Sequence, residues 1–354
     1  MADLLVYRAE GAAAAHGGDL YGFTVTEWRL PATYPPFAAI LFIPATWLPV
    51  PVLKTAFLAG NALLLGVLVV LSARLAGRPL PMPWLCAATA VALWLEPVFQ
   101  TLLFGQVNLA VTCLVLWDLT RSPGARAQGL ALGLAAGIKI IPAVFIVHLF
   151  LRGRRREATT ATAAFTATVL LGALLLPSAS AGFWTRRLYE TGRVGKTWLV
   201  DNQSLRGLIA RALGDPAPGL AWALPAAAVG VTGLYLATRA RQDGHGILLT
   251  AFTALLISPI SWSHHWVWCV PLLAVLLAGG RRHLAAVTAA VFTARTLWLV
   301  PHEGDRDLHL PWWEQPLASP YPLLGLALLV SAVAGHQVLA AQPSERISSA
   351  STIR

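Results

Sequence analysis

Long apolar runs constrain this chain more than any other feature of its sequence. A membrane-spanning helix needs roughly 20 apolar residues to cross a hydrocarbon core of about 30 Å. Runs of this kind lie at 53–72, 82–98, 102–118, 157–177, 220–238, 246–260, 266–279, 284–300 and 321–340. Charged residues make up 12% of the 354 residues, against about 25% in soluble proteins. The sequence therefore predicts an all-α polytopic membrane protein with about 9–11 membrane-embedded segments, and excludes a soluble globule, a coiled coil or a disordered chain.

The net charge of +10 comes from arginines that gather in short clusters between these runs, for example Arg152 with Arg154, Arg155 and Arg156. Such clusters mark cytoplasmic loops by the positive-inside rule, and they favour anionic membrane lipids. A nucleic-acid partner is not expected, because no basic face with interleaved aromatic residues is visible. The three cysteines lie in apolar runs without metal-ligand spacing, so neither a metal nor a cofactor is predicted.

Two segments interrupt the regular pattern. Residues 34–50 contain four prolines, which predicts a helix that lies in the membrane interface or dips into it. Residues 129–151 are apolar but contain Gly137, Lys139 and Pro142. If this segment crossed the membrane fully, the arginine cluster that follows it would lie outside the cell, against the positive-inside rule. The sequence therefore predicts a broken, re-entrant hairpin. Alternatively, one of the two preceding segments does not cross.

Loop charges predict one transmembrane domain over residues 1–340 and a cytoplasmic tail over 341–354. The segments 1–33 and 178–219 become outer loops, and the unusual polar residues fall almost entirely on that outer side. We therefore expect a site at the outer face of a cell membrane.

Several polar residues stand out against this background. Lys139 lies deep in its apolar run, where a cation is costly and usually functional, although it could also extend toward the interface. His264 and His265 are adjacent and cannot form the i, i+4 pair of a helical zinc site. The tryptophans around them, Trp262 and Trp266, could equally be interfacial anchors.

Other candidates have ordinary structural explanations. Gln106 and Asn108 could form interhelical hydrogen bonds, and Asn202, Gln203 and Arg206 could be plain loop residues. Asp3 is close to the end of the chain, where side chains are usually solvated, and Asp19 could belong to a turn.

Taken in series, seven strings resemble the motifs of glycosyltransferase family 87. They are DLLVYRAEG, GGDLYGF, TYPPFAAILFIP, FGQVNL, GLAAGIKIIPAVF, NQSLRG and SPISWSHHWVW, which run in order from Asp3 onward. The resemblance implies a bacterial α-1,2-mannosyltransferase of the C-type membrane fold in the plasma membrane. It would take a polyprenyl-phosphate sugar donor and a glycan or glycolipid acceptor, and would invert the anomeric centre. Family members carry a transmembrane helix before the catalytic aspartate; its absence here implies a start site further upstream or a truncated form.

The resemblance also assigns roles to the candidate residues. The family's catalytic aspartate falls on Asp3, which would act as the base. Groups that carry positive charge or donate hydrogen bonds would hold the phosphate of the sugar donor. These are Lys139, Arg206, His264 and His265. The pockets for the sugar and the acceptor would be lined by Tyr7, Asp19, Tyr34, Gln106, Asn108, Asn202, Gln203, Trp262 and Trp266. The two tryptophans would stack on the sugar or on the prenyl chain.

Two other classes of function stay open at this point. A transporter or flippase for a lipid-linked sugar would share broken helices and buried cations, but the expected inverted repeat is not visible. A structural subunit or an inactive relative would account for the missing first helix.

Overall fold

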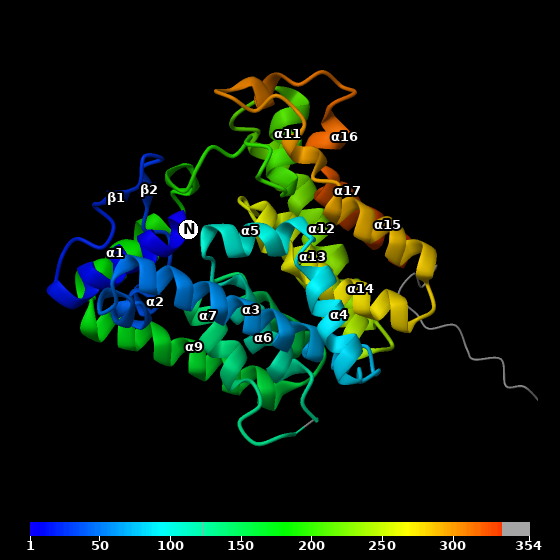
Figure 1. Ribbon diagram of the computed structural model, residues 1–354, viewed down its shortest axis with the longest axis horizontal. Coiled ribbons are helices and arrows are strands. Elements are labelled where there is room, and N and C mark those ends of the chain that lie inside the picture. Colours follow the sequence, from blue (N-terminus) through cyan, green and yellow to red (C-terminus); the bar gives the residue numbers. More distant parts are fainter. Residues whose placement is uncertain (123, 335–354) are drawn as a thin grey trace, which may run out of the picture.

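The computed structural model describes residues 1–122 and 124–334, and this part of the chain is almost entirely helical (Figure 1). One small hairpin of β1 (Thr24–Val25) and β2 (Leu30–Pro31) is the only sheet in these ranges. The predicted all-α class is therefore confirmed. The predicted tail 341–354, and the end of the predicted span 321–340, lie outside the described residues.

The first half of the chain supplies most of the layer around the site. Its helices are α1 (Ala2–His16), α2 (Pro36–Leu41), η1 (Ile43–Thr46), α3 (Val50–Leu75), α4 (Met82–Ala92), α5 (Glu96–Phe104), α6 (Asn108–Leu119), α7 (Leu130–Ile138), α8 (Ala143–Leu151) and α9 (Arg155–Leu175). The short elements α10 (Pro177–Gly182), η2 (Phe183–Arg187) and η3 (Thr191–Arg193) follow. In the second half, α11 (Leu205–Leu213), α12 (Gly219–Arg239), α13 (Asp243–Ile257), η4 (Ser263–Trp268), α14 (Cys269–Ala278), α15 (Arg282–Thr293), η5 (Thr296–Trp298), η6 (Arg306–His309), α16 (Gln315–Ala318) and α17 (Pro320–Val333) complete the fold.

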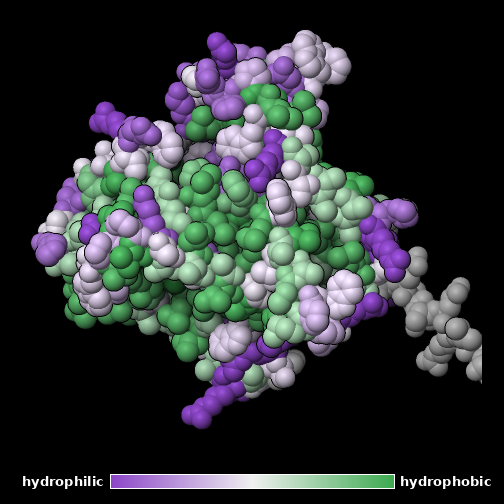
Figure 2. Space-filling model, viewed as in Figure 1, coloured by the Kyte–Doolittle hydropathy of each residue, from purple (hydrophilic) through white to green (hydrophobic). Residues whose placement is uncertain are grey.

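Three described helices, α3, α9 and α12, are long and apolar enough to cross a membrane alone. A fourth span results if α4 and α5, which meet at an angle of 76°, count as one. Figure 2 shows apolar side chains over the middle of the visible face, with hydrophilic ones gathered over α11 and α16 and over the loop after α6. This banding is what a bilayer requires, and it confirms a membrane protein; the full number of embedded segments stays a prediction.

The predicted break in residues 129–151 is confirmed. Helix α7 ends at Ile138 and α8 begins at Ala143, so Lys139 lies in the irregular stretch between them. A second break separates α5 from α6 and contains Gln106. There Gly105 has φ +72°, and a Cβ on it would lie 2.9 Å from the Cβ of Leu4. Only glycine combines this backbone conformation with such a close approach of α1.

Within the segment 1–33, which was predicted as an outer loop, residues 2–16 form the helix α1. Its alanines and leucines favour helix, and Gly17 ends it in the left-handed conformation at φ +70°. Leu4 and Tyr7 are buried against the residues around α2 and α3. The amino end of α1 thus lies beside α5 (Figure 1), close to both breaks.

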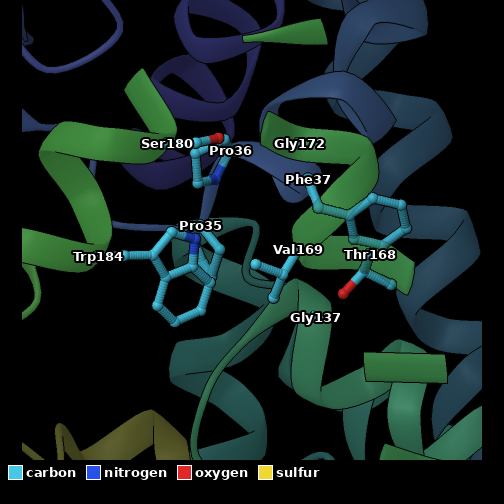
Figure 3. Close-up of a pocket in the computed structure, with 9 residues that line it drawn as sticks. All are labelled: Pro35, Pro36, Phe37, Gly137, Thr168, Val169, Gly172, Ser180 and Trp184. Carbon is cyan, nitrogen blue, oxygen red and sulfur yellow. The ribbon is translucent and has the colours of Figure 1, made fainter. Parts of the chain in front are cut away.

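Close packing of α7 on α9 fixes the position of the first break. Figure 3 shows Gly137 and Thr168 among the residues that line a small, mostly apolar pocket between α2, α7, α9, α10 and η2. A Cβ on Gly137 would collide with Oγ1, Cβ and Cγ2 of Thr168.

We expect Gly137→Ala to lower the free energy of unfolding by about 1–3 kcal/mol through overpacking. Thermal unfolding of the detergent-solubilised protein measures the change. Adding Thr168→Ala removes two of the three colliding atoms and should restore part of the loss. Equal midpoints for wild type and Gly137→Ala would contradict this packing.

Candidate active site

Gln106 is the centre of a buried polar network that joins three separate parts of the chain. Its Oε1 accepts hydrogen bonds from the hydroxyls of Tyr7 (2.8 Å) and Tyr34 (3.0 Å). Its Nε2 donates to Oδ2 of Asp3 at 2.6 Å. Because the two hydroxyls occupy the acceptor end, the amide group must present its donor end to Asp3. The second break therefore orients the Asp3 carboxylate.

Lys139 forms the second half of the site. Its Nζ donates to Oδ1 of Asn108 at 2.8 Å and lies 2.9 Å from Nε2 of His265. A lysine ammonium only donates, so Nε2 of His265 accepts and the ring proton sits on Nδ1. That Nδ1 is buried and has no hydrogen-bond partner among the described residues.

The turn that carries the two histidines is held by helices α5 and α6. Nδ2 of Asn108 donates to the carbonyl of His264 at 3.0 Å, and Oγ1 of Thr101 donates to the same oxygen at 3.2 Å. Both ring nitrogens of His264 are buried without a hydrogen-bond partner in the described part of the chain. Its ring packs edge-on against Phe104 and His265. Such unsatisfied buried groups suit a bound polar ligand.

Opposite charges meet where the two halves adjoin. Asp3 and Lys139 interact electrostatically, and their immediate partners Gln106 and Asn108 are two residues apart in the chain. Burial raises the pKa of Asp3 to about 6, against the lowering effects of the Gln106 hydrogen bond and the charge of Lys139. A carboxylate with such a pKa is a stronger proton acceptor than an exposed aspartate and is still ionised at neutral pH.

A cavity of about 40 Å³ adjoins Lys139, Asn108 and His265. Beyond this polar end, its wall is apolar apart from Thr112. It comes from α6, the α7–α8 break, α8, α13 and the residue before α14. The apolar lining residues are Val111, Val115, Ile141, Pro142, Phe145, Leu255 and Trp268. The cavity therefore offers a cation at one end and a hydrophobic wall along the rest, a pattern that fits an amphiphile with an anionic head.

Other predicted site residues lie elsewhere or are used by the fold. Arg206 donates to Oγ1 of Thr191 at 2.8 Å and stacks over the ring of Trp222; no contact described for it reaches Asp3 or Lys139. Trp266 is fully buried in the core between α13, α15 and α17, which leaves no free face for stacking on a sugar.

The amides of the loop before α11 are likewise committed to the backbone. Asn202 bonds the backbone at Thr197, Pro259, Ser204 and Ser261. Gln203 forms hydrogen bonds with the backbone of Val200, Ala318 and Tyr321. Asp19 caps its own turn by accepting from the amide of Tyr21, and Trp262 is half-buried and pairs through its backbone with Asn202.

Two buried carboxyl groups near the site were not among the predicted site residues. Glu96 accepts from Tyr321 and Trp298, which ties α5 to α17 and η5. Asp201 accepts from the amide of Ser263 at the start of the histidine turn. An acidic residue inside an apolar run was the available signal for Glu96. For Asp201 there was only its place at the head of the NQSLRG string.

Comparison with known proteins shows the family of the chain. The model of glycosyltransferase family 87 matches residues 32–259. A polyprenol-phosphate-mannose-dependent alpha-(1-2)-phosphatidylinositol mannoside mannosyltransferase of Mycobacterium tuberculosis is 34% identical over 97% of this chain and 86% of its own length. A pentamannoside mannosyltransferase of the same type from Mycolicibacterium smegmatis is 39% identical over 78% of this chain and 69% of its own. No solved structure matches the chain significantly. The chain therefore belongs to glycosyltransferase family 87, and it is a membrane glycosyltransferase.

Proposed function

We propose that the protein transfers a mannosyl unit from a polyprenyl-phosphate donor to a hydroxyl of a phosphatidylinositol mannoside or related glycolipid or glycan, at the outer face of the plasma membrane. The observation that carries this proposal is that Asp3, bonded to Gln106, and Lys139, bonded to Asn108, are largely buried and interact electrostatically from the two ends of the Gln106–Asn108 segment. The names of the relatives supply the sugar, the donor class and the acceptor class.

In this reaction Asp3 accepts the proton of the acceptor hydroxyl as its oxygen attacks the anomeric carbon. The bond between that carbon and the phosphate oxygen breaks, and the electron pair leaves with the prenyl phosphate. A new bond to the acceptor oxygen forms on the opposite face, so the centre inverts. The departing phosphate gains negative charge, which cationic and hydrogen-bond donor groups stabilise.

Lys139 is suited to hold that phosphate. Its ammonium lies at the polar end of the cavity, and the buried Nδ1 of His265 beside it is a donor without a partner among the described residues. The apolar wall of the cavity, with Val115, Phe145 and Leu255, would receive the first part of the prenyl chain. A cavity with a cation at one end and an apolar wall along the rest suits a prenyl phosphate, which has an anionic head and a hydrocarbon chain, better than a nucleotide sugar.

The direct test is transfer by membrane vesicles. Vesicles containing the protein are incubated with radiolabelled polyprenyl-phosphate mannose and a phosphatidylinositol mannoside, and the lipid products are separated. We expect label in a longer mannoside. Passage of the donor across the membrane without any mannosylated product would favour the flippase instead.

Transfer should depend on pH through Asp3. Burial raises the pKa of Asp3 to about 6, and only the ionised form accepts a proton. We therefore expect kcat/KM to fall about tenfold for each pH unit below 6. The donor is a phosphodiester that stays ionised throughout, so it adds no step of its own. A profile that stays flat from pH 5 to pH 8 would contradict Asp3 as the base.

A further inference from the structure

Tyr34 is held in place by α1 and by the loop that follows α1. Its carbonyl accepts from the hydroxyl of Tyr21 in that loop at 2.8 Å. The amide of the preceding residue, Thr33, donates to Oε1 of Glu10 in α1 at 3.1 Å. The buried ring of Tyr34 packs edge-on against that of Tyr7, with the centroids 5.2 Å apart. Because the backbone and the ring are both held, the hydroxyl of Tyr34 has a fixed place.

This hydroxyl belongs to a set of three mutual contacts. It lies 3.0 Å from Oε1 of Gln106 and 2.9 Å from the hydroxyl of Tyr7, which itself lies 2.8 Å from the same Oε1. Two hydroxyls carry two protons, so only two of the three contacts can be hydrogen bonds at one time. At least one proton points at Oε1, because a buried amide oxygen needs a donor. The network therefore uses both protons, and neither is left for a sugar.

The two hydroxyls decide which end of the Gln106 amide faces Asp3. In the structure Nε2 donates to Oδ2 of Asp3 at 2.6 Å. If the amide turned over, its oxygen would face the carboxylate, and only a protonated Asp3 could donate to it. The hydroxyl protons oppose that rotation, because Nε2 in the place of Oε1 would offer them no acceptor. The tyrosines therefore favour the ionised form of Asp3, which is the form that can take up a proton.

The ring of Tyr34 reaches the other half of the site. Nζ of Lys139 lies over this ring, 5.6 Å from its centroid. An N–H group over an aromatic face is attracted to the ring. The ring thus gives Lys139 a third contact, beside those to Asn108 and His265. One side chain therefore contacts Gln106 through its hydroxyl and Lys139 through its ring.

We propose that Tyr34 is a positioning residue that joins the two halves of the site. Together with Tyr7, its hydroxyl holds the donor end of Gln106 toward Asp3, and its ring supports the lysine at the polar end of the cavity. This role differs from the predicted lining of the sugar and acceptor pockets, and it rests on the proposed functions of the aspartate and the lysine. Phenylalanine separates the two parts of the role, because it keeps the ring and removes the hydroxyl.

The part played by the hydroxyl can be measured without turnover, through the protonation of Asp3. Hydrophobic carbodiimides react with protonated buried carboxyl groups, and digestion with trypsin then releases the peptide of residues 1–8, in which Asp3 is the only acidic side chain. Mass spectrometry of that peptide gives the labelled fraction at each pH. In the full-length protein in detergent, we expect the double variant Tyr7→Phe and Tyr34→Phe to move the midpoint of labelling up by about one pH unit. Without the hydroxyls, Gln106 can turn over and accept from protonated Asp3.

Each single phenylalanine variant should move the midpoint less than half as far, because the remaining hydroxyl still holds the amide. If the double variant does not fold, Tyr34→Phe alone must still move the midpoint upward. The matched control is Tyr189→Phe, which removes the hydroxyl of an exposed tyrosine and should leave the midpoint unchanged. The other ionisable groups that face Asp3 are the same in all these variants, namely Lys139, Glu10, Asp201 and the amino group of Met1.

The part played by the ring is tested by comparing Tyr34→Phe with Tyr34→Leu in the transfer assay. Both variants lose the hydroxyl, but only leucine loses the aromatic face beside Lys139. We expect KM for the donor to be about 2–5-fold higher in Tyr34→Leu than in Tyr34→Phe. Equal KM values would overturn the contribution of the ring.

An unmoved midpoint in the double variant would overturn the role of the hydroxyls, even if transfer were lost, because that loss would then be structural. Failure of the proposed function looks different. Wild-type protein would form no product, or Asp3→Asn would remain active, while the labelling midpoint still decides whether the tyrosine hydroxyls act on Asp3.

Discussion

Asp3→Asn is expected to reduce mannosyl transfer by about 10²–10⁴-fold, the range typical of losing a general base. Asparagine has nearly the same shape and can still bond Gln106, whose amide lies 2.6 Å from the carboxylate in the wild type. The fold and donor binding should therefore persist. What disappears is the carboxylate, the one side-chain partner of Gln106 among the described residues that can take up a proton at neutral pH. Initial rates with saturating donor and acceptor measure the effect.

The control for this experiment is Asp215→Asn, since that carboxylate is outside the network and caps a turn. We expect it to keep wild-type rates. Comparable rates for Asp3→Asn and wild type would show that another group removes the proton, and the base would then have to be sought elsewhere.

Much of the architecture followed from hydropathy and charge. The runs at 53–72, 157–177 and 220–238 became the long helices α3, α9 and α12. The break around Lys139 was predictable because the arginine clusters on both sides demanded an even number of crossings. By contrast, the helix at residues 2–16 was not expected, since its alanines and polar residues show no periodicity of a single apolar face. Its burial depends on packing against α2 and α3, which are distant in sequence.

The site could be predicted only in part. Gln106, Asn108 and Lys139 stood out because amides and a cation in apolar runs are costly. What the sequence does not contain is their pairing, which arises where the two helix breaks meet. The same limit explains Arg206, whose charge suggested a phosphate ligand, although its partners are Thr191 and Trp222. Asn202 and Gln203 looked like ligand groups, and in the fold they satisfy backbone groups of the loops.

Lys139→Met is the second change with a large expected effect. Methionine keeps most of the length and the apolar stem of lysine, so the α7–α8 break can pack as before. The loss is that of the ammonium at the polar end of the cavity, which contacts Asn108 and His265. Stabilisation of charge that develops in a water-poor site is typically worth about 10²–10³-fold in rate. We expect kcat/KM for the donor to fall by that factor.

Lys139→Arg distinguishes charge from shape, because guanidinium restores the charge with a wider, planar head. It should recover part of the lost kcat/KM, whereas methionine recovers none. The matched control is Lys196→Met, which removes an exposed lysine paired with Asp305. It should leave transfer within about twofold, because exposed ion pairs contribute little. If Lys139→Met and Lys196→Met transferred equally well, the phosphate could not be bound at Lys139.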